Sequence, residues 1–190
     1  MSSVIISGDT SGAVTIAAPA VAGTNTLTLQ AGTATNSMNT LATAVASTSG
    51  TSIDFTGIPS WVKRITVMLN VVSTSGTSNL QVQIGAGSVD TSGYTSVTQM
   101  PGLAATSTAA FLITTQLSTA ADTNSGVMTL VTMGSNIWQE TCICRDIGNN
   151  VIVYGQGIKT LSGTLDRVRL TTVNGTDTFD AGSVNILYEG

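Results

Sequence analysis

The sequence contains no histidine among its 190 residues. Imidazole is the commonest general base near neutral pH and a frequent transition-metal ligand, so its absence excludes histidine-dependent catalytic triads and most metal sites. Charge is also scarce, because Lys, Arg, Asp and Glu together make up 8% of the chain, against about 25% in ordinary domains. We therefore expect a non-catalytic chain whose surface consists largely of Ser, Thr, Asn, Gln and Gly.

Basic residues are few, with six Lys and Arg against ten Asp and Glu and a net charge of −4. No basic stripe is present that could neutralise a phosphate backbone, so we expect no nucleic-acid partner. The opening MSSVIISGDTSGA lacks the charged and apolar regions of a signal peptide, and no apolar run reaches the roughly 18 residues of a membrane span. We expect a soluble chain made in a cytoplasm, without membrane insertion.

Cysteine is limited to Cys142 and Cys144, two residues apart in an expected strand. Their side chains would share one face of the strand at a spacing too long for a disulfide. Without a third cysteine or a histidine, the pair cannot complete a four-ligand zinc site. The sequence therefore predicts two free, buried thiols, no metal and no cofactor.

The residues that are abundant favour β-structure. Within residues 62–72, Ile65, Val67, Leu69 and Val71 alternate with more polar residues, which predicts a strand with one buried side. Similar alternation occurs at 80–84, 168–170 and 184–188, and further strands are expected near 109–115, 127–133, 136–145 and 150–156. Asn174-Gly175 is the strongest hairpin signal. About eight short strands separated by turn residues predict an all-β fold, an antiparallel two-sheet sandwich of jelly-roll type over residues 51–190.

Residues 1–50 have a different character. Short apolar runs at 4–6, 14–16 and 27–29 are separated by turn residues, and none is long enough to form its own core. We interpret residues 1–50 as an extended N-terminal arm and linker. For residues 36–50 two interpretations stay open, a plain linker or a short helix, because Met38, Leu41, Ala42 and Val45 have helical spacing behind Ser37.

Catalysis by paired carboxylates does not depend on histidine, since glycosidases can work with Asp and Glu alone. The candidates are Asp166, Asp177 and Asp180. Asp177 and Asp180 follow the Asn174-Gly175 turn, where Asp commonly accepts hydrogen bonds from nearby backbone. We interpret them as turn residues rather than as catalytic groups or calcium ligands, and we assign no catalytic, cofactor-binding or metal-binding residue.

Aromatic residues raise the question of glycan binding, which uses an exposed ring. Trp61 lies beside Lys63 and Arg64, and we expect it to anchor the edge of the core while the charges stay in water. The same question applies to Tyr94 and Trp138. Because the alternation places Trp138 on one face with Glu140, Cys142 and Cys144, we expect that face to be buried.

Three stretches carry a resemblance to a known family. The run SGDTSGAVTIAAPAVAGTNTLTLQAGT at 7–33, through Thr10-Ser11-Gly12 and residues 19–29, resembles a segment of tail-fibre and other virion proteins of tailed bacteriophages. FTGIPSWVKRI at 55–65 and LDRVRLTTVNGTDTFDAGSVNILYEG at 165–190 resemble uncharacterised phage and prophage proteins. None of the three motifs contains a catalytic residue.

The resemblance implies a structural protein of the virion, assembled in the host cytoplasm. We expect a homotrimeric tail-fibre or tail-tip subunit involved in host attachment, with a host-surface glycan as a candidate partner. The alternative is a capsid decoration (cement) protein that binds the major capsid protein through its N-terminal arm and stabilises the head. In both cases the expected partners are other copies of the chain and, through residues 1–50, other virion proteins.

Overall fold

The computed structural model describes residues 3–7, 13–17 and 39–190, and every helix or strand assigned within those ranges is a β-strand. The chain divides into two compact units, Met1–Asn36 and Ser37–Gly190. In the first unit β1 (Ser3–Ser7) pairs antiparallel with β2 (Ala13–Ala17). The apolar runs at 4–6 and 14–16 therefore do form strands, whereas the predicted run at 27–29 lies outside the described residues.

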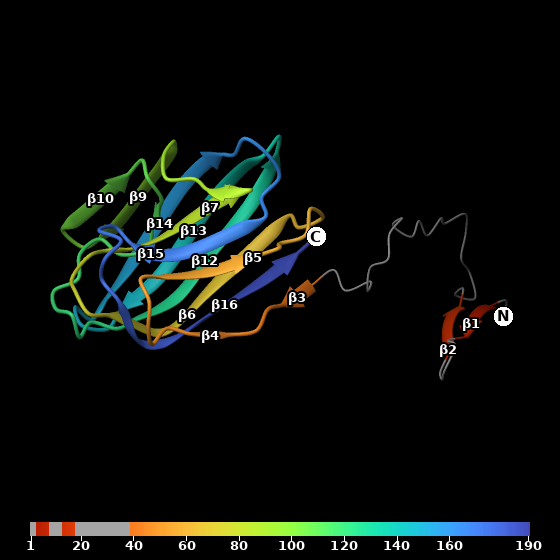
Figure 1. Cartoon of the computed structure of the whole chain (residues 1–190), viewed down its shortest axis with the longest axis horizontal. Coiled ribbons are helices and arrows are strands. Elements are labelled where there is room, and N and C mark those ends of the chain that lie inside the picture. The colour runs from red at the N-terminus through yellow and green to blue at the C-terminus, as the bar shows by residue number, and fades with distance from the viewer. Residues whose placement is uncertain (1–2, 8–12, 18–38) are drawn as a thin grey trace. The chain divides into compact units, whose positions relative to one another are not determined.

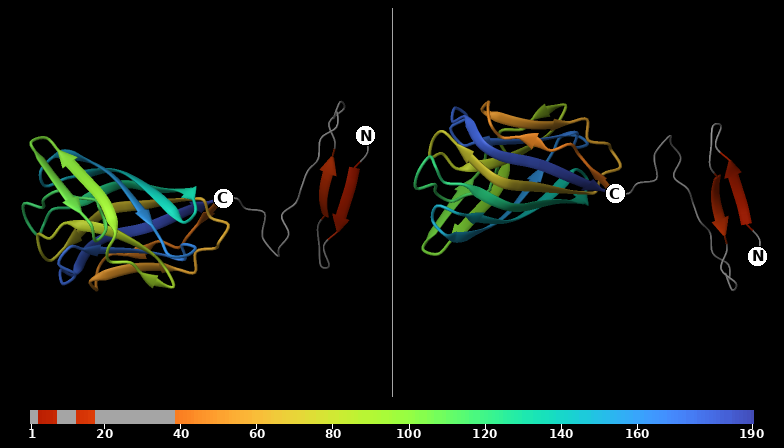
Figure 2. Two further views of the ribbon diagram at one scale, coloured as in Figure 1. Left: turned by 90° about the horizontal axis from the view of Figure 1, so that it is seen from above. Right: turned by 90° about the horizontal axis from the view of Figure 1, so that it is seen from below.

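The second unit consists of two antiparallel sheets that face each other (Figures 1 and 2). The nine strands of the large sheet are β3 (Asn39–Leu41), β4 (Val45–Ala46), β6 (Arg64–Thr74), β9 (Tyr94–Met100), β10 (Leu103–Ser107), β12 (Asn124–Gly134), β13 (Ile137–Asp146), β14 (Val151–Thr160) and β16 (Phe179–Glu189). The five strands of the small sheet are β5 (Ser52–Thr56), β7 (Leu80–Ala86), β8 (Ser88–Val89), β11 (Phe111–Leu112) and β15 (Arg167–Thr172). The predicted all-β fold with two antiparallel sheets is confirmed.

Strand order fixes which side chains become neighbours. The large sheet runs β10-β9-β14-β13-β12-β6-β16-β3, with β4 also paired to β16, and the small sheet runs β11-β7-β15-β5, with β8 paired to β7. The core lies between the sheets and is built from the inward residues of the alternating strands, such as Ile65 and Val67 on β6 and Val82 and Ile84 on β7, all of them buried.

The alternation on β6 breaks at Val71. Its φ of 53° lies in the left-handed region, and the pairing of β6 with β16 shifts register between Ala181 and Ser183. This irregularity leaves Val71 exposed and buries Val72. On β16 the bulge faces Gly182, where a Cβ atom would lie 2.3 Å from the Val71 carbonyl oxygen. The prediction that Val71 shares the buried face is therefore wrong, because an alternating pattern does not reveal a bulge.

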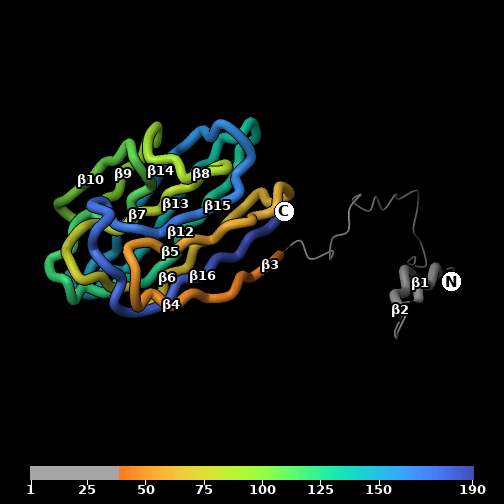
Figure 3. The backbone as a smooth tube through the Cα atoms, in the orientation of Figure 1, coloured from red at the N-terminus to blue at the C-terminus, as the bar shows by residue number. Residues whose placement is uncertain are grey.

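Residues 39–46 join the large sheet. Strands β3 and β4 both pair with β16 at its outer edge (Figure 3). Between them, the Ala42 amide donates to the Ile186 carbonyl oxygen at 2.9 Å. For residues 39–46 both interpretations, helix and linker, are wrong. Their backbone forms its hydrogen bonds with the edge of β16, as strands do. The second compact unit accordingly begins at Ser37, upstream of the expected boundary between residues 50 and 51.

The Asn174-Gly175 turn forms, but it does not make a hairpin. Asn174 Oδ1 accepts hydrogen bonds from the amides of Thr176 (3.0 Å) and Asp177 (3.2 Å), and Gly175 has a φ of 68°. The flanking strands β15 and β16 belong to different sheets. The turn signal was correct and the hairpin prediction wrong, because the chain uses this turn to cross from the small sheet to the large one.

Candidate interaction surface

The outer face, meaning the side of the large sheet that points away from the small sheet, carries an apolar row across four strands. Ile143 on β13 lies opposite Tyr154 on β14 and opposite Val127 on β12, and Val127 lies opposite Met68 on β6. Tyr154 is 56% exposed, Ile143 54% and Val127 44%. Directly opposite residues of antiparallel strands share one face, so these four side chains, the apolar row, form a continuous stripe.

The ladder beside the apolar row is also uncharged. It consists of Val97, Gln156, Thr141, Thr129, Thr66 and Leu187, in order from β9 to β16. Further exposed apolar residues on this face are Val131, Ile152 and Ile158. Charges occur towards the margins, where Arg64 pairs with Glu189 at 3.4 Å and Arg145 Nη2 donates to Asn150 Oδ1 at 3.5 Å.

The local sequence explains why this face is apolar. On β13, Cys142 and Cys144 point into the core while Ile143 points outward, and on β14 Val153 points inward while Tyr154 points outward. Apolar residues on both sides of a strand are typical of sheets that are covered on both faces. A large contiguous apolar patch on a monomer usually marks an interaction site.

A hollow of about 450 Å³ lies on the outer face where β9, β14 and β13 meet the end of β10 and Thr108. Its outward side chains are Thr95, Val97, Thr106, Gln139, Gln156 and Ile158. None of these six is charged, and within the described part of the chain the amides of Gln139 and Gln156 form no hydrogen bond. The hollow can accept a neutral group that exchanges hydrogen bonds with amides and hydroxyls, and these side chains offer no acid or base.

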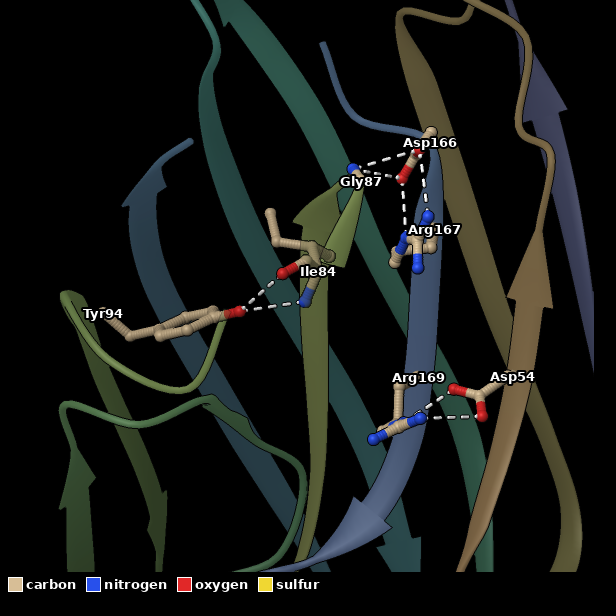
Figure 4. A network of polar contacts seen from close by, with 7 residues as sticks. All are labelled: Asp54, Ile84, Gly87, Tyr94, Asp166, Arg167 and Arg169. Atoms are coloured by element: carbon tan, nitrogen blue, oxygen red, sulfur yellow. Dashed lines mark hydrogen bonds and ion pairs between the residues drawn. The ribbon is translucent and has the colours of Figure 1, made fainter. Parts of the chain in front are cut away.

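Tyr94 closes the bottom of this hollow, but its hydroxyl is already used. The hydroxyl accepts a hydrogen bond from the Ile84 amide at 2.9 Å and donates towards the Ile84 carbonyl oxygen (Figure 4). It also lies within hydrogen-bond distance of the Asp90 carbonyl oxygen. Burial is the main reason that the pKa of Tyr94 lies well above its ordinary value. The ring packs edge-to-face on Phe111 with 4.9 Å between centroids. Tyr94 is therefore a core residue rather than an exposed sugar platform.

The two tryptophans also belong to the core. Trp138 is buried, as its alternation predicted. It borders a second hollow of about 450 Å³, which Lys63 and Asn136 also line. Trp61 is partly buried against the core, with its ring centroid 6.1 Å from that of Tyr188. The predicted role of Trp61 as an anchor at the core edge is confirmed. Tyr154 is the exposed ring on the outer face, and sequence reasoning missed it.

Two of the three candidate carboxylates have local partners. Asp166 accepts hydrogen bonds from Arg167 Nε at 2.7 Å and from the Gly87 amide at 3.1 Å, and the bond from Arg167 is the main cause of its lowered pKa. Asp177 accepts from the Ser78 amide at 3.0 Å and from Asn174 Nδ2 at 2.7 Å. Asp180 is exposed on β16. None of the three lines either hollow described above.

The inner face of β13 carries buried titratable groups. Among the described residues, neither carboxyl oxygen of the fully buried Glu140 has a hydrogen-bond partner, and burial raises its pKa to about 8. Cys142 and Cys144 are free and buried, as predicted, and burial raises the pKa of both thiols. Alternation predicted the burial of Glu140, but it does not reveal whether a buried carboxyl has a partner.

No family model matches this chain, and no curated protein or solved structure shows significant similarity to it. Among the described residues, no helix is long and apolar enough to cross a membrane. Within the same residues, no group of three or more Cys, Asp or Glu side chains could hold a metal ion. The outer face and its hollow are therefore the features on which a functional argument can be built.

Proposed function

We propose that this chain is a non-catalytic structural protein of a tailed-bacteriophage virion, and within it a homotrimeric tail-fibre or tail-tip subunit that takes part in host attachment. The main structural support is the outer face, where exposed Tyr154, Ile143 and Val127 lie beside an uncharged ladder. Such a surface suits binding to other molecules. The resemblance of residues 7–33, 55–65 and 165–190 to phage proteins supports the virion assignment.

The non-catalytic part of the proposal is supported by the state of the acidic groups. Asp166 is engaged by Arg167 and Gly87, and Asp177 is engaged by its own turn. Glu140 is enclosed in the core, where no substrate reaches it. Acid–base catalysis needs a group within hydrogen-bond reach of the substrate, and neither of the two hollows described above is lined by any of these carboxylates.

Host attachment is supported by the hollow on the outer face. Its free amides, Gln139 and Gln156, and its apolar walls, Val97 and Ile158, suit a neutral sugar, whose hydroxyl groups need donors and acceptors and whose ring faces are apolar. A host-surface glycan is therefore the partner that we propose for this end of the outer face.

Assembly into the particle is the role that we propose for residues 1–36, the part of the predicted arm that does not belong to the sandwich unit. An arm with short strands reaches its full set of hydrogen bonds on a neighbouring chain. Jelly-roll connectivity of the two sheets also belongs to this proposal. Deletion of residues 1–36 should leave the sandwich folded and prevent incorporation into particles. Normal incorporation of the shortened chain would show that the arm is not the attachment device.

The alternative, a capsid decoration protein, has one specific observation in its favour. The chain divides into two compact units, Met1–Asn36 and Ser37–Gly190, as expected if one part binds the major capsid protein and the other forms an external knob. The two functions predict different copy numbers, because fibres are present in tens per particle and decoration proteins in hundreds.

Localisation on intact virions tests the proposal. Gold-labelled antibody against the sandwich should label the tail end, and quantitative mass spectrometry of purified particles should count tens of copies. Label spread over the head, together with hundreds of copies per particle, would contradict the tail-fibre function and support the decoration protein. Absence of the chain from purified particles would contradict both.

A further inference from the structure

We propose that the outer face of the large sheet is the surface through which this chain binds a second copy of itself, with the apolar row at the centre of the contact. The inference rests on the proposed function, which includes an oligomer, and it adds where the interface between the copies lies. Its starting point is the row formed by Tyr154, Ile143, Val127 and Met68 across four adjacent strands.

Charge favours another copy as the occupant. The chain has a net charge of −4, so two copies repel unless they meet where charge is absent. The apolar row and the uncharged ladder beside it provide such a place, whereas the outer side of the small sheet carries the Arg169–Asp54 and Arg167–Asp166 ion pairs. Two copies that meet through the apolar row and this ladder bring no charges of the same sign together. Such a contact also needs no partner of complementary charge.

The size of the face is sufficient. Without β9, which borders the hollow proposed for the glycan, the five strands from β14 to β16 lie about 4.8 Å apart, and about 3.4 Å per residue over the ten residues of β13 gives a plane of roughly 800 Å². A stable interface between proteins buries about 800 Å² on each partner. Two-sheet stacking at about 10 Å is a standard way to bury such a face.

The composition of the face also fits a sheet-on-sheet contact. Its apolar side chains alternate with Thr and Gln side chains, which form hydrogen bonds at the border of an interface without carrying charge. Tyr154, at the end of the apolar row, supplies the kind of large side chain that often dominates binding energy. Direct stacking of this face on the same face of a second copy gives a two-fold pair, whereas a three-fold axis would bring one end of the face against the other end in the next copy. The number of copies is a result of the test.

Sedimentation equilibrium of the purified full chain tests the inference with two single charge substitutions. I143E places a carboxylate in the apolar row, and T56E places the same charge on the exposed outer side of β5 in the small sheet. Both positions are exposed, so both variants should fold, which circular dichroism and thermal unfolding verify. We expect the unsubstituted chain to associate in the micromolar range, I143E to weaken association by at least about 30-fold, and T56E to leave it unchanged.

A neutral variant separates lost apolar contact from added charge. I143T keeps a β-branched residue and should weaken association by a smaller factor than I143E. A chain that stays monomeric throughout this range would overturn the inference, as would an I143E variant that associates as tightly as the unsubstituted chain. Equal weakening by T56E would place the interface elsewhere. These results concern the purified chain, so they are independent of whether the protein occurs in virions.

Discussion

The two sheets of the sandwich distribute polar and apolar side chains in opposite ways. In the small sheet Ile84 is buried, and on the outer side Arg169 donates to both carboxylate oxygens of Asp54, at 2.6 and 2.9 Å (Figure 4). In the large sheet Ile143 is exposed on the outer side, while Glu140 is buried without a partner on the inner side. A sheet face that meets water is normally polar. On the outer side of the small sheet Arg169 and Asp54 meet solvent, and the contrast is the basis of our proposal that the outer side of the large sheet faces another molecule.

The strongest test of this contrast compares two isoleucines. Ile84→Ala should lower the free energy of unfolding by about 2–5 kcal/mol, because it leaves a cavity in the core. Ile143→Ala should change it by only about 0.5 kcal/mol in dilute, monomeric protein, because the side chain is exposed there. Urea denaturation measures both values. Similar losses for the two variants would mean that Ile143 is part of the core, which would end the contrast between the sheets.

The second test concerns the buried carboxyl of the large sheet. The pKa of Glu140 is raised from 4.5 to about 8 in the folded chain, so the unfolded chain loses this proton first as pH rises. Stability should therefore fall between about pH 4.5 and 8 and then level off. Glu140→Gln removes the titration and should be more stable than the unsubstituted chain by a few kcal/mol above pH 8, with little difference at pH 4.

The control for this test is Glu189→Gln. Glu189 is paired with Arg64 at the sheet margin, and an exposed ion pair contributes at most about 1 kcal/mol. Denaturation curves at several pH values separate the two variants. A Glu140→Gln advantage that does not grow with pH would show that the carboxyl is hydrated or paired in solution.

Asp122, in the loop before β12, provides the opposite case of a buried carboxyl that is fully engaged. Burial opposes ionisation of Asp122, but hydrogen bonds from the amides and hydroxyls of Thr119 and Ser118 outweigh it and lower the pKa. Asp122→Ala should cost about 1–3 kcal/mol at neutral pH, because four donors lose their acceptor. The contribution is present above the ordinary pKa and is lost as pH falls, so the difference should shrink in acid. A difference that stays constant down to pH 2 would contradict this account.

The smallest expected effect belongs to the outer side of the small sheet. Arg169→Met removes the ion pair with Asp54 and should cost less than about 1 kcal/mol, since both side chains remain partly exposed. A double-mutant cycle with Asp54→Asn measures the coupling, and high salt should reduce it. A coupling of several kcal/mol would mean that this side is covered by another molecule, as we infer for the large sheet.

Much of the fold could be predicted because its strands alternate clearly. The periods in 62–72, 80–84 and 136–145 match β6, β7 and β13, and the buried face of Trp138 and Cys142 followed from the same pattern. Strands β9 and β10 were missed because Ser, Thr and Ala occupy both of their faces, which weakens the period. The edge strands β3 and β4 depend on a distant partner, β16, and leave no local signal.

The outer face was harder to predict because it depends on register. The apolar row joins residues from four strands, and one-residue slips would place Tyr154 and Val127 elsewhere. A partial signal was present, since β13 and β14 have apolar residues at inward and at outward positions, as at Cys142 and Ile143. That pattern indicates a strand covered on both sides, but it does not show that one cover comes from outside the sandwich.

The position of β16 has a consequence for synthesis of the chain. This strand lies between β6 and the pair β3 and β4, yet in sequence it follows every other strand of the sheet. Until residues 179–189 leave the ribosome, one edge of β6 has no partner, and β3 and β4 have nothing to pair with. A nascent chain therefore exposes an open sheet edge late in translation, when pairing with a second nascent chain competes with correct closure.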